Sequence, residues 1–390
     1  MRHLYVHVPF CQRRCSYCDF SIAVRKRIPA QEYVETILNE LTRVESPGAV
    51  PRGNQNPGRG PGARHPGEVD TLYFGGGTPS LLPPDAITTL VDKLLRSADP
   101  GPAARGGQEV TLEANPEDVT PDKAKAWRAA GINRVSLGAQ SFDDAVLKWM
   151  HRSHDAARIG AAVHALRGAG IENISLDLIF GLPEELKRNW ERDLDMAHAL
   201  RTTHLSLYGL TVEPRTPLDR WISRGATQAP DDERYAEEYL LAHRRLTAGG
   251  FLFYEVSNAA LPGFHSRHNS AYWSGKPYRG LGPAAHSFDG TTRRWNLRAW
   301  EAYRRAIAEG RSAVESEERL TAEQQELERV YLALRTEEGL ATTAPYRPLP
   351  PLMSRGWFVE HNGRLRCTPE GWLRLDSLVN ELAMHTETQP

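Results

Sequence analysis

Short apolar runs alternate with amphipathic helical patterns through the first two thirds of the chain. The runs are rich in β-branched and aromatic residues and have the length of buried strands. They lie at residues 4–8, 71–74, 110–113, 134–137, 174–180 and 204–210. Between them, apolar residues recur at helical spacing over residues 33–44, 87–95, 121–130, 143–151, 156–169 and 190–199. Six strands that alternate with helices predict a parallel sheet with helices packed against its outside.

The number of strands limits the architecture. Six β/α units are too few to close an eight-stranded barrel. We therefore predict an α/β fold whose core, residues 1–210, is an open partial (β/α)6 barrel with a concave face that a lid or a ligand covers. Residues 46–68 interrupt this core with a stretch rich in Pro, Gly and Arg. Such a composition predicts a disordered surface insertion.

The pattern changes after residue 210. Residues 211–315 predict an extension with long loops and a helix at residues 231–248. Residues 316–390 predict a separate module made of a helix, a hairpin that turns at Asn362 and Gly363, and a further helix. This order indicates a small α+β, winged-helix-like module. Its mixed charges favour a packing or partner role over DNA binding.

Composition excludes several classes of protein. Hydrophobic residues make up 40% and charged residues 25% of the chain, which are ordinary globular values. The net charge of −1 argues against a nucleic-acid partner. No apolar run approaches the roughly 18 residues that a membrane-spanning helix needs. Because strand-like residues 4–8 follow the N-terminus almost directly, we expect no cleaved export signal and a cytoplasmic location.

Three of the four cysteines, Cys11, Cys15 and Cys18, form a C-x3-C-x2-C motif. Three thiolates on one short loop can each hold one iron of a [4Fe-4S] cluster and leave the fourth iron open to a small ligand. The odd number and the length of the chain argue against a disulfide framework. A closed zinc site needs four ligands, and the distant Cys367 is a poor fourth one. Zinc or inert thiols are the alternatives to the cluster.

A glycine-rich turn follows the second predicted strand, in the sequence GGGTP from Gly75 to Pro79. Glycines let the backbone approach a ligand closely and expose its amide groups. The turn matches neither G-x-G-x-x-G nor a phosphate-binding P-loop. A tight strand-to-helix turn without a ligand is the alternative interpretation.

The cysteine motif, the glycine turn and the six β/α units together resemble the radical S-adenosylmethionine (SAM) superfamily. That resemblance implies that the open iron binds the amino and carboxylate groups of SAM, and that the glycine turn binds its amino group. An electron from the cluster then cleaves SAM to methionine and a 5′-deoxyadenosyl radical. The fold implied is the open partial (β/α)6 barrel of the radical SAM type.

Longer motifs resemble the oxygen-independent coproporphyrinogen III oxidases, the HemN group. They are YVHVPFC at residues 5–11, LEANPE at 112–117, LGAQSF at 137–142, MHR at 150–152 and SLDLIFGLP at 175–183. In that group, the positions that match Tyr5, Gly76, Thr78, Glu113, Gln140, Arg152 and Asp177 surround SAM. As single residues, each would more often be a surface charge or a helix cap.

Two features separate the chain from those oxidases. Phe20 stands where the oxidases carry a fourth cysteine. The residues His268, Asn269, Tyr272 and Trp273 form the motif HNxxYW, which marks the HemW group of haem chaperones. The resemblance to this group covers the chain apart from residues 46–68 and implies that the protein binds haem.

The chemistry of the HNxxYW motif fits haem. A neutral imidazole is an axial ligand of haem iron, and the aromatic faces of Tyr272 and Trp273 suit a porphyrin edge. We therefore expect His268 to ligate the iron, with His265 and His286 as competitors nearby. Alternatively, His268 and Asn269 cap a turn or bond to the backbone, and Trp273 belongs to the core.

These observations predict a haem chaperone that holds a [4Fe-4S] cluster, SAM and haem. Its implied partners are haem-accepting proteins and a low-potential electron donor of the flavodoxin or ferredoxin type, without nucleic acid. Transient membrane association is left open, as is residual cleavage of SAM. The alternative is a radical SAM oxidoreductase that decarboxylates coproporphyrinogen III, which the replacement of a cysteine by Phe20 disfavours. A third option is a protein of this fold that binds no haem.

Overall fold

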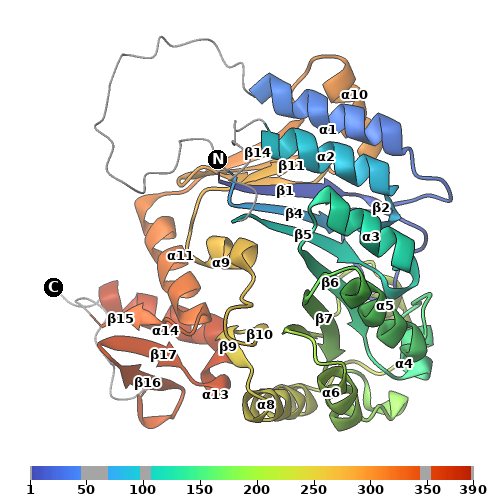
Figure 1. The fold of residues 1–390 in the computed structure, drawn as a ribbon. Helices are drawn as coiled ribbons and strands as arrows, with labels where there is room; N and C mark the ends of the chain where they lie inside the picture. The colour runs from blue at the N-terminus through green and yellow to red at the C-terminus, as the bar shows by residue number, and fades with distance from the viewer. Residues whose placement is uncertain (1, 45–68, 97–106, 343–352, 388–390) are drawn as a thin grey trace.

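A large, strongly curved sheet organises the computed structural model, which describes residues 2–44, 69–96, 107–342 and 353–387. The predicted insertion at residues 46–68 lies outside the described residues. The sheet has nine strands in the order β11-β1-β4-β5-β6-β7-β8-β10-β9 (Figure 1). Because the edge strands β11 and β9 do not pair with each other, the sheet is open, as predicted.

The six predicted strands lie side by side in chain order and are parallel. They are β1 (His3–Val8), β4 (Thr71–Gly76), β5 (Glu109–Ala114), β6 (Arg134–Gln140), β7 (Asn173–Phe180) and β8 (His204–Gly209). Three strands from the second half of the chain extend the sheet. The parallel strand β11 (Arg279–Leu281) pairs with β1, and the antiparallel strands β10 (Asn258–Ala260) and β9 (Leu252–Glu255) follow β8.

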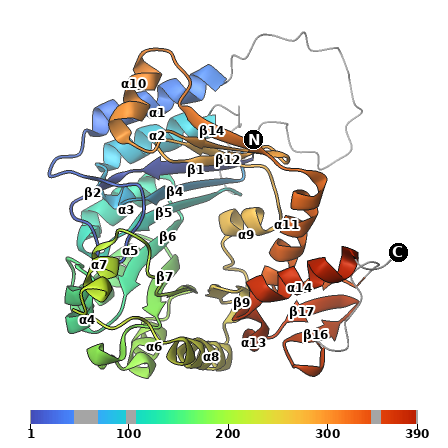
Figure 2. The same cartoon turned by 180° about the vertical axis from the view of Figure 1, so that it is seen from behind.

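Helices cover the outer, convex face of the curved sheet, as both views show (Figures 1 and 2). They are α1 (Ala30–Val44), α2 (Pro84–Arg96), α3 (Pro121–Ala130), α4 (Asp144–Trp149), α5 (Ala156–Gly168) and α6 (Trp190–Ala199). Side chains of Thr120, Asp155 and Asn189 cap the N-termini of α3, α5 and α6. Each cap satisfies an amide that has no partner within its helix, which fixes where the helix begins.

The two faces of the sheet differ in chemistry. On β5, Val110 and Leu112 are fully or almost fully buried and belong to the main apolar core. The alternate residues Glu109, Thr111 and Glu113 belong to the opposite face, because successive side chains of a strand point to opposite sides. The apolar side holds the helices, and the polar side lines the concave interior where a ligand can bind.

The middle of the chain builds structure that the sequence pattern did not predict. A three-stranded antiparallel sheet consists of β12 (His286–Phe288), β13 (Thr292–Asn296) and β14 (Val314–Arg319). Three helices of this region were also not predicted: α7 (Pro217–Ser223), α9 (Arg267–Trp273) and α10 (Trp300–Ala308). The helix predicted at residues 231–248 is α8 (Asp232–Ala248). The predicted division between residues 211–315 and 316–390 falls inside β14, which pairs with β13.

The C-terminal α+β module has the predicted order of elements. It comprises α11 (Ala322–Arg335), a three-stranded sheet of β15 (Leu340–Ala341), β17 (Arg364–Cys367) and β16 (Phe358–His361), and the helices α13 (Pro369–Trp372) and α14 (Leu375–Glu387). The hairpin turns at Asn362 and Gly363, both with positive φ, as predicted. No helix among the described residues is long and apolar enough to cross a lipid bilayer.

A buried carboxylate ties the extension to the core. Glu40 on α1 accepts hydrogen bonds from Gly282 N (2.8 Å), from Asn296 Nδ2 (2.6 Å) and from the Tyr303 hydroxyl (2.5 Å). Burial raises the pKa of its carboxyl group. Three segments distant in sequence therefore depend on one side chain.

We expect Glu40→Ala to lower the free energy of unfolding by about 3 kcal/mol, because it leaves buried donors without an acceptor. Urea denaturation followed by circular dichroism measures this change. Glu35→Ala, at an exposed position of the same helix, is the matched control and should change the free energy by less than about 0.5 kcal/mol. Equal effects of the two substitutions would contradict the role assigned to Glu40.

Candidate functional site

The three clustered cysteines lie on a loop between the short strands β2 (Phe10–Cys11) and β3 (Ala23–Val24), which pair in parallel. Two backbone hydrogen bonds of Ser16 fix the middle of this loop. Its N–H donates to Met150 O at the end of α4 (3.1 Å), and its carbonyl accepts from Leu218 N of α7 (2.8 Å). The loop is therefore held between two helices.

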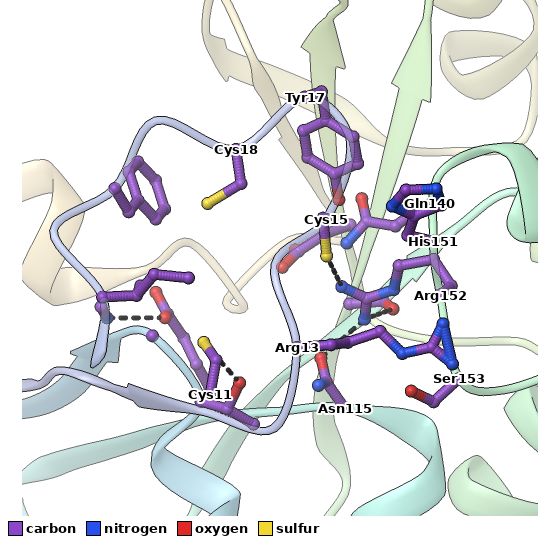
Figure 3. A pocket seen from close by; sticks show the side chains of 18 of the residues that line it. Cys11, Arg13, Cys15, Tyr17, Cys18, Asn115, Gln140, His151, Arg152 and Ser153 are labelled. Carbon is purple, nitrogen blue, oxygen red and sulfur yellow. Dashed lines mark hydrogen bonds between the residues drawn. The ribbon is translucent and has the colours of Figure 1, made fainter. Parts of the chain in front are cut away.

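The thiols of Cys11, Cys15 and Cys18 are free and line one cavity of about 370 Å³ (Figure 3). Among the described residues, no group of three His, Cys, Asp or Glu side chains is arranged to hold a metal ion. A single zinc ion needs its ligands gathered at one point, whereas a cubane cluster takes one thiolate at each of three separate irons. Three thiols around one cavity are the donor set that a [4Fe-4S] cluster with one open iron takes.

Burial changes the acidity of these thiols. It raises the pKa of the Cys11 thiol to about 11 and also raises the pKa of Cys18. Iron binds the thiolate form, so incorporation of a cluster would release protons from these side chains. The Cys11 sulfur also lies 3.3 Å from the Thr78 hydroxyl, which connects the cysteine loop to the glycine turn.

The glycine turn at the end of β4 lies directly against the start of the cysteine loop. Gly77 N donates to Val8 O and Thr78 N donates to Phe10 O, both at 2.8 Å. A Cβ atom on Gly77 would lie 2.8 Å from Phe10 O, closer than such atoms can approach, so glycine is required there. Gly76 has φ of 109° and donates its N–H to Glu113 Oε2 (3.1 Å).

Six of the seven residues predicted to surround SAM line the cavity of the cysteines. They are Gly76, Thr78, Glu113, Gln140, Arg152 and Asp177. Tyr5 does not line this cavity. Its ring stacks on Tyr73 with centroids 6.1 Å apart, and its hydroxyl lies 3.1 Å from His7 Nδ1. A direct contact of Tyr5 with SAM stays a prediction.

Arg152 lies closer to the cysteines than its sequence position suggested. Its Nη1 lies 3.5 Å from the Cys15 sulfur, and its Nη2 donates to Asn115 Oδ1 (2.6 Å) and Gly138 O (2.9 Å) (Figure 3). The guanidinium is therefore placed to stabilise the negative charge of the thiolates, besides pairing with a ligand carboxylate.

Two carboxyl groups at the inner end of the cavity have altered acidity. Burial raises the pKa of Glu113 to about 7, and the nearby Asp177 adds to the shift. Burial also raises the pKa of Asp177, against the hydrogen bonds from Ser136, Ser206 and Ser175. A ligand that brings an ammonium group next to Glu113 would favour its ionised form.

Sequence reasoning missed residues that complete the cavity, among them Ser136 and Tyr208. Ser136 Oγ donates to Asp177 Oδ1 at 2.9 Å. Ser136 precedes the recognised Gln140 by four residues on the same strand, so alternation along β6 could have identified it. Tyr208 lies on β8 with 47% of its surface exposed, and its strand carried no recognised motif.

The HNxxYW residues do not line the cavity of the cysteines. They lie on the short helix α9, whose first amides, Arg267 N and His268 N, donate to the carboxylate of Glu109 at 2.9 Å. The His268 side chain is 1% exposed, and burial lowers its pKa to about 3. Its Nδ1 lies 2.7 Å from Thr71 Oγ1 and its Nε2 lies 2.7 Å from the Tyr272 hydroxyl. Both ring nitrogens are therefore engaged.

Comparison with known proteins identifies the family to which the chain belongs. Residues 62–197 match the model of the radical SAM superfamily. The chain is 36% identical to the heme chaperone HemW of Mycobacterium tuberculosis (strain CDC 1551 / Oshkosh), over 97% of this chain and 94% of the relative. The chain belongs to the HemW family. It is also 33% identical to the heme chaperone HemW of Bacillus subtilis (strain 168), over 87% of this chain and 85% of that relative.

A solved structure shares the fold of this HemW family member. It is the coproporphyrinogen III oxidase HemN of Escherichia coli, described as a radical SAM enzyme, with a TM-score of 0.76 and 23% identity. The match covers 99% of this chain and 90% of that one. The predicted radical SAM fold is thereby confirmed over nearly the whole length.

The cysteine loop provides a first test of the site. We expect anaerobically reconstituted Cys15→Ser to lack the broad visible absorption of a thiolate-bound cluster, because one of three iron ligands is lost. Cys367→Ala is the control, since Cys367 is buried on β17 outside the cavity. Iron and sulfide contents in Cys15→Ser equal to those of the unmodified protein would refute the ligand set.

Glu113 provides a second test. If its carboxylate accepts a hydrogen bond from the amino group of SAM, binding requires ionisation of a group with a pKa of about 7. The ionised fraction, and with it the affinity for SAM, should rise about tenfold between pH 6 and pH 8. Isothermal titration across this range measures the effect. Glu113→Gln should bind more weakly and without this rise; a retained tenfold rise in that variant would exclude Glu113 as its source.

Proposed function

We propose that this protein is a haem chaperone that holds a [4Fe-4S] cluster and SAM, binds haem and delivers it to acceptor proteins. The observation that carries this proposal is the identity of 36% with a heme chaperone HemW over almost the full length of both chains. The cavity supports it, because three thiols and six of the residues predicted to bind SAM line it. No separate domain is needed for either cofactor.

Different residues of the cavity would bind the two cofactors. Cys11, Cys15 and Cys18 would hold three irons, and Arg152 beside Cys15 would stabilise the negative charge of the thiolates. Gly76 and Glu113 would bind the amino group of SAM. When bound, the cluster supplies an electron that can cleave SAM. The chain's own contribution is to bind, orient and enclose the two groups.

Haem binding is proposed for the HNxxYW region, with His268, Asn269, Tyr272 and Trp273 as its predicted residues. Iron ligation by His268 would require one of its two hydrogen bonds, to Thr71 or to Tyr272, to break. Since the side chain is buried, that event would also require the residues that cover it to move. Ligation by His268 therefore stays a prediction, and it applies to a conformation other than the one described here.

The partners follow from this function. We propose that haem-accepting proteins receive the cargo and that a flavodoxin- or ferredoxin-type donor reduces the cluster, in the cytoplasm and without nucleic acid. Transient contact with membranes is compatible with the proposal. Phe20 lines the cavity and has 59% of its surface accessible, so it offers an exposed apolar contact to a donor.

One assay separates the chaperone from a coproporphyrinogen oxidase, for which the intact SAM cavity is the supporting observation. The reconstituted protein is given SAM and a low-potential reductant under anaerobic conditions, with haem in one sample and coproporphyrinogen III in another. We expect about one haem bound per chain and no protoporphyrinogen. Catalytic conversion of coproporphyrinogen III would instead establish the oxidase, and failure to bind haem would refute the chaperone.

A further inference from the structure

The cavity of the cysteines reaches the molecular surface at the cysteine loop. Arg13, Asp19 and Phe20 line the cavity and are exposed to solvent. Cys15 and Cys18 are themselves partly exposed, and Figure 3 shows both on this loop. A cluster held by these thiols would lie close to the surface here. Because electron transfer weakens steeply with distance, a protein that reduces the cluster has to approach at this loop.

The cysteine loop and the short strand that follows it are strongly basic. Residues 12–27 contain five cationic side chains and one carboxylate, so they carry a net charge of +4, whereas the whole chain carries −1. All five cationic side chains are exposed to solvent. We call them the basic surface, and they are Arg13, Arg14, Arg25, Lys26 and Arg27.

Hydrogen bonds hold both halves of the basic surface close to the cysteines. Arg25 N donates to Cys11 O at 2.9 Å, so residues 25–27 follow directly on a contact with the first cysteine. In the other half, Arg14 Nη1 donates to Cys18 O at 3.2 Å, which holds this guanidinium against the loop. Cations that are far apart in the segment therefore border the same loop.

Most charges of the basic surface are not compensated within the molecule. Of its five cations, Arg25 alone forms an ion pair with a described residue, Glu301 at 3.2 Å, and both side chains are roughly half exposed. A hydrogen bond from Ser21 Oγ to Arg298 O (2.9 Å) brings a further exposed arginine to the edge of the loop. Uncompensated charges of one sign attract a protein surface of the opposite sign.

Exposed apolar side chains lie between the two groups of cations in the sequence. Phe20 has 59% and Val24 has 46% of its surface accessible. Arginine and aromatic side chains are enriched in protein interfaces. Electron-transfer partners form small, weak interfaces, for which a few apolar side chains within a charged surface are sufficient.

We propose that the basic surface, together with Phe20 and Val24, is the docking site of an acidic one-electron carrier protein. The inference rests on the proposed function, which includes an electron donor, and it adds where the donor binds and which charge it carries. Carboxylates of the carrier would steer the encounter and turn its redox group towards the cysteine loop. One electron then passes from the reduced carrier to the cluster; the carrier is oxidised, the cluster is reduced, and no bond forms or breaks.

The test measures binding of an acidic flavodoxin that carries FMN to the full-length reconstituted protein, by biolayer interferometry and without haem. We expect the affinity to fall at least about tenfold between about 50 and 300 mM salt, because salt screens exposed charges. The double variant Lys26→Glu, Arg27→Glu should bind about tenfold more weakly at the lower salt concentration and show little dependence on salt.

The matched control makes the same change of charge elsewhere. Arg192→Glu with Arg244→Glu reverses two exposed cations on α6 and α8, outside the cavity, and should bind the flavodoxin like the unmodified protein. Iron and sulfide contents, and the extent of reduction by dithionite, should be unchanged in both double variants. These readouts separate a loss of docking from damage to the cluster.

The possible results distinguish this inference from the proposed function. Equal affinity of the Lys26→Glu, Arg27→Glu variant and the unmodified protein, or binding that salt does not weaken, would overturn the docking site. Tighter binding of the unmodified protein to phosphatidylserine vesicles or to a DNA duplex than to the flavodoxin would also overturn it. None of these results affects haem uptake, which is measured separately and whose absence would refute the chaperone function.

Discussion

The site depends on the close approach of two backbone segments, the glycine turn after β4 and the start of the cysteine loop after β1. Gly77 and Thr78 donate to carbonyl groups of Val8 and Phe10, and there is no room for a side chain at Gly77. This contact places Cys11 next to Thr78 and the Gly76 amide next to Glu113. A cluster and its ligand can share one cavity only because these two segments touch.

Contacts along the concave interior connect the glycine turn to α9. Glu113 accepts hydrogen bonds from the Gly76 amide (3.1 Å) and from the Tyr73 hydroxyl (2.9 Å). The Tyr73 ring stacks on His268, with centroids 5.0 Å apart. A continuous series of contacts therefore runs from the glycine turn to the helix of the HNxxYW motif. The polar face of the sheet is a structural framework as well as a binding surface.

Local sequence patterns were sufficient for the parallel core, because strands such as β7 (Asn173–Phe180) alternate buried apolar residues with residues of the polar face. They were insufficient for β11 and β14. The first has three residues, and the second, VESEER, is exposed throughout. Both strands form because another segment of the chain pairs with them. The pattern of apolar and polar residues within each strand does not indicate this pairing.

The candidate site, too, could be predicted from the sequence only in part. Motifs identified the three cysteines and six of the residues around their cavity, because these side chains lie on adjacent strands and turns. Tyr5 lies behind Tyr73, and His268 is enclosed by Thr71 and Tyr272. Glu109 caps α9 across a separation of 159 residues in sequence. Such contacts depend on tertiary packing, so the sequence alone could not reveal that both ring nitrogens of His268 have hydrogen-bond partners.

The most direct measurement is the metal content of the anaerobically purified protein, combined with electron paramagnetic resonance of the reduced sample with and without SAM. The account predicts about four irons and four sulfides per chain, and a spectrum that changes when SAM binds to the open iron. Zinc in place of iron, or a cluster spectrum that SAM leaves unchanged, would contradict it.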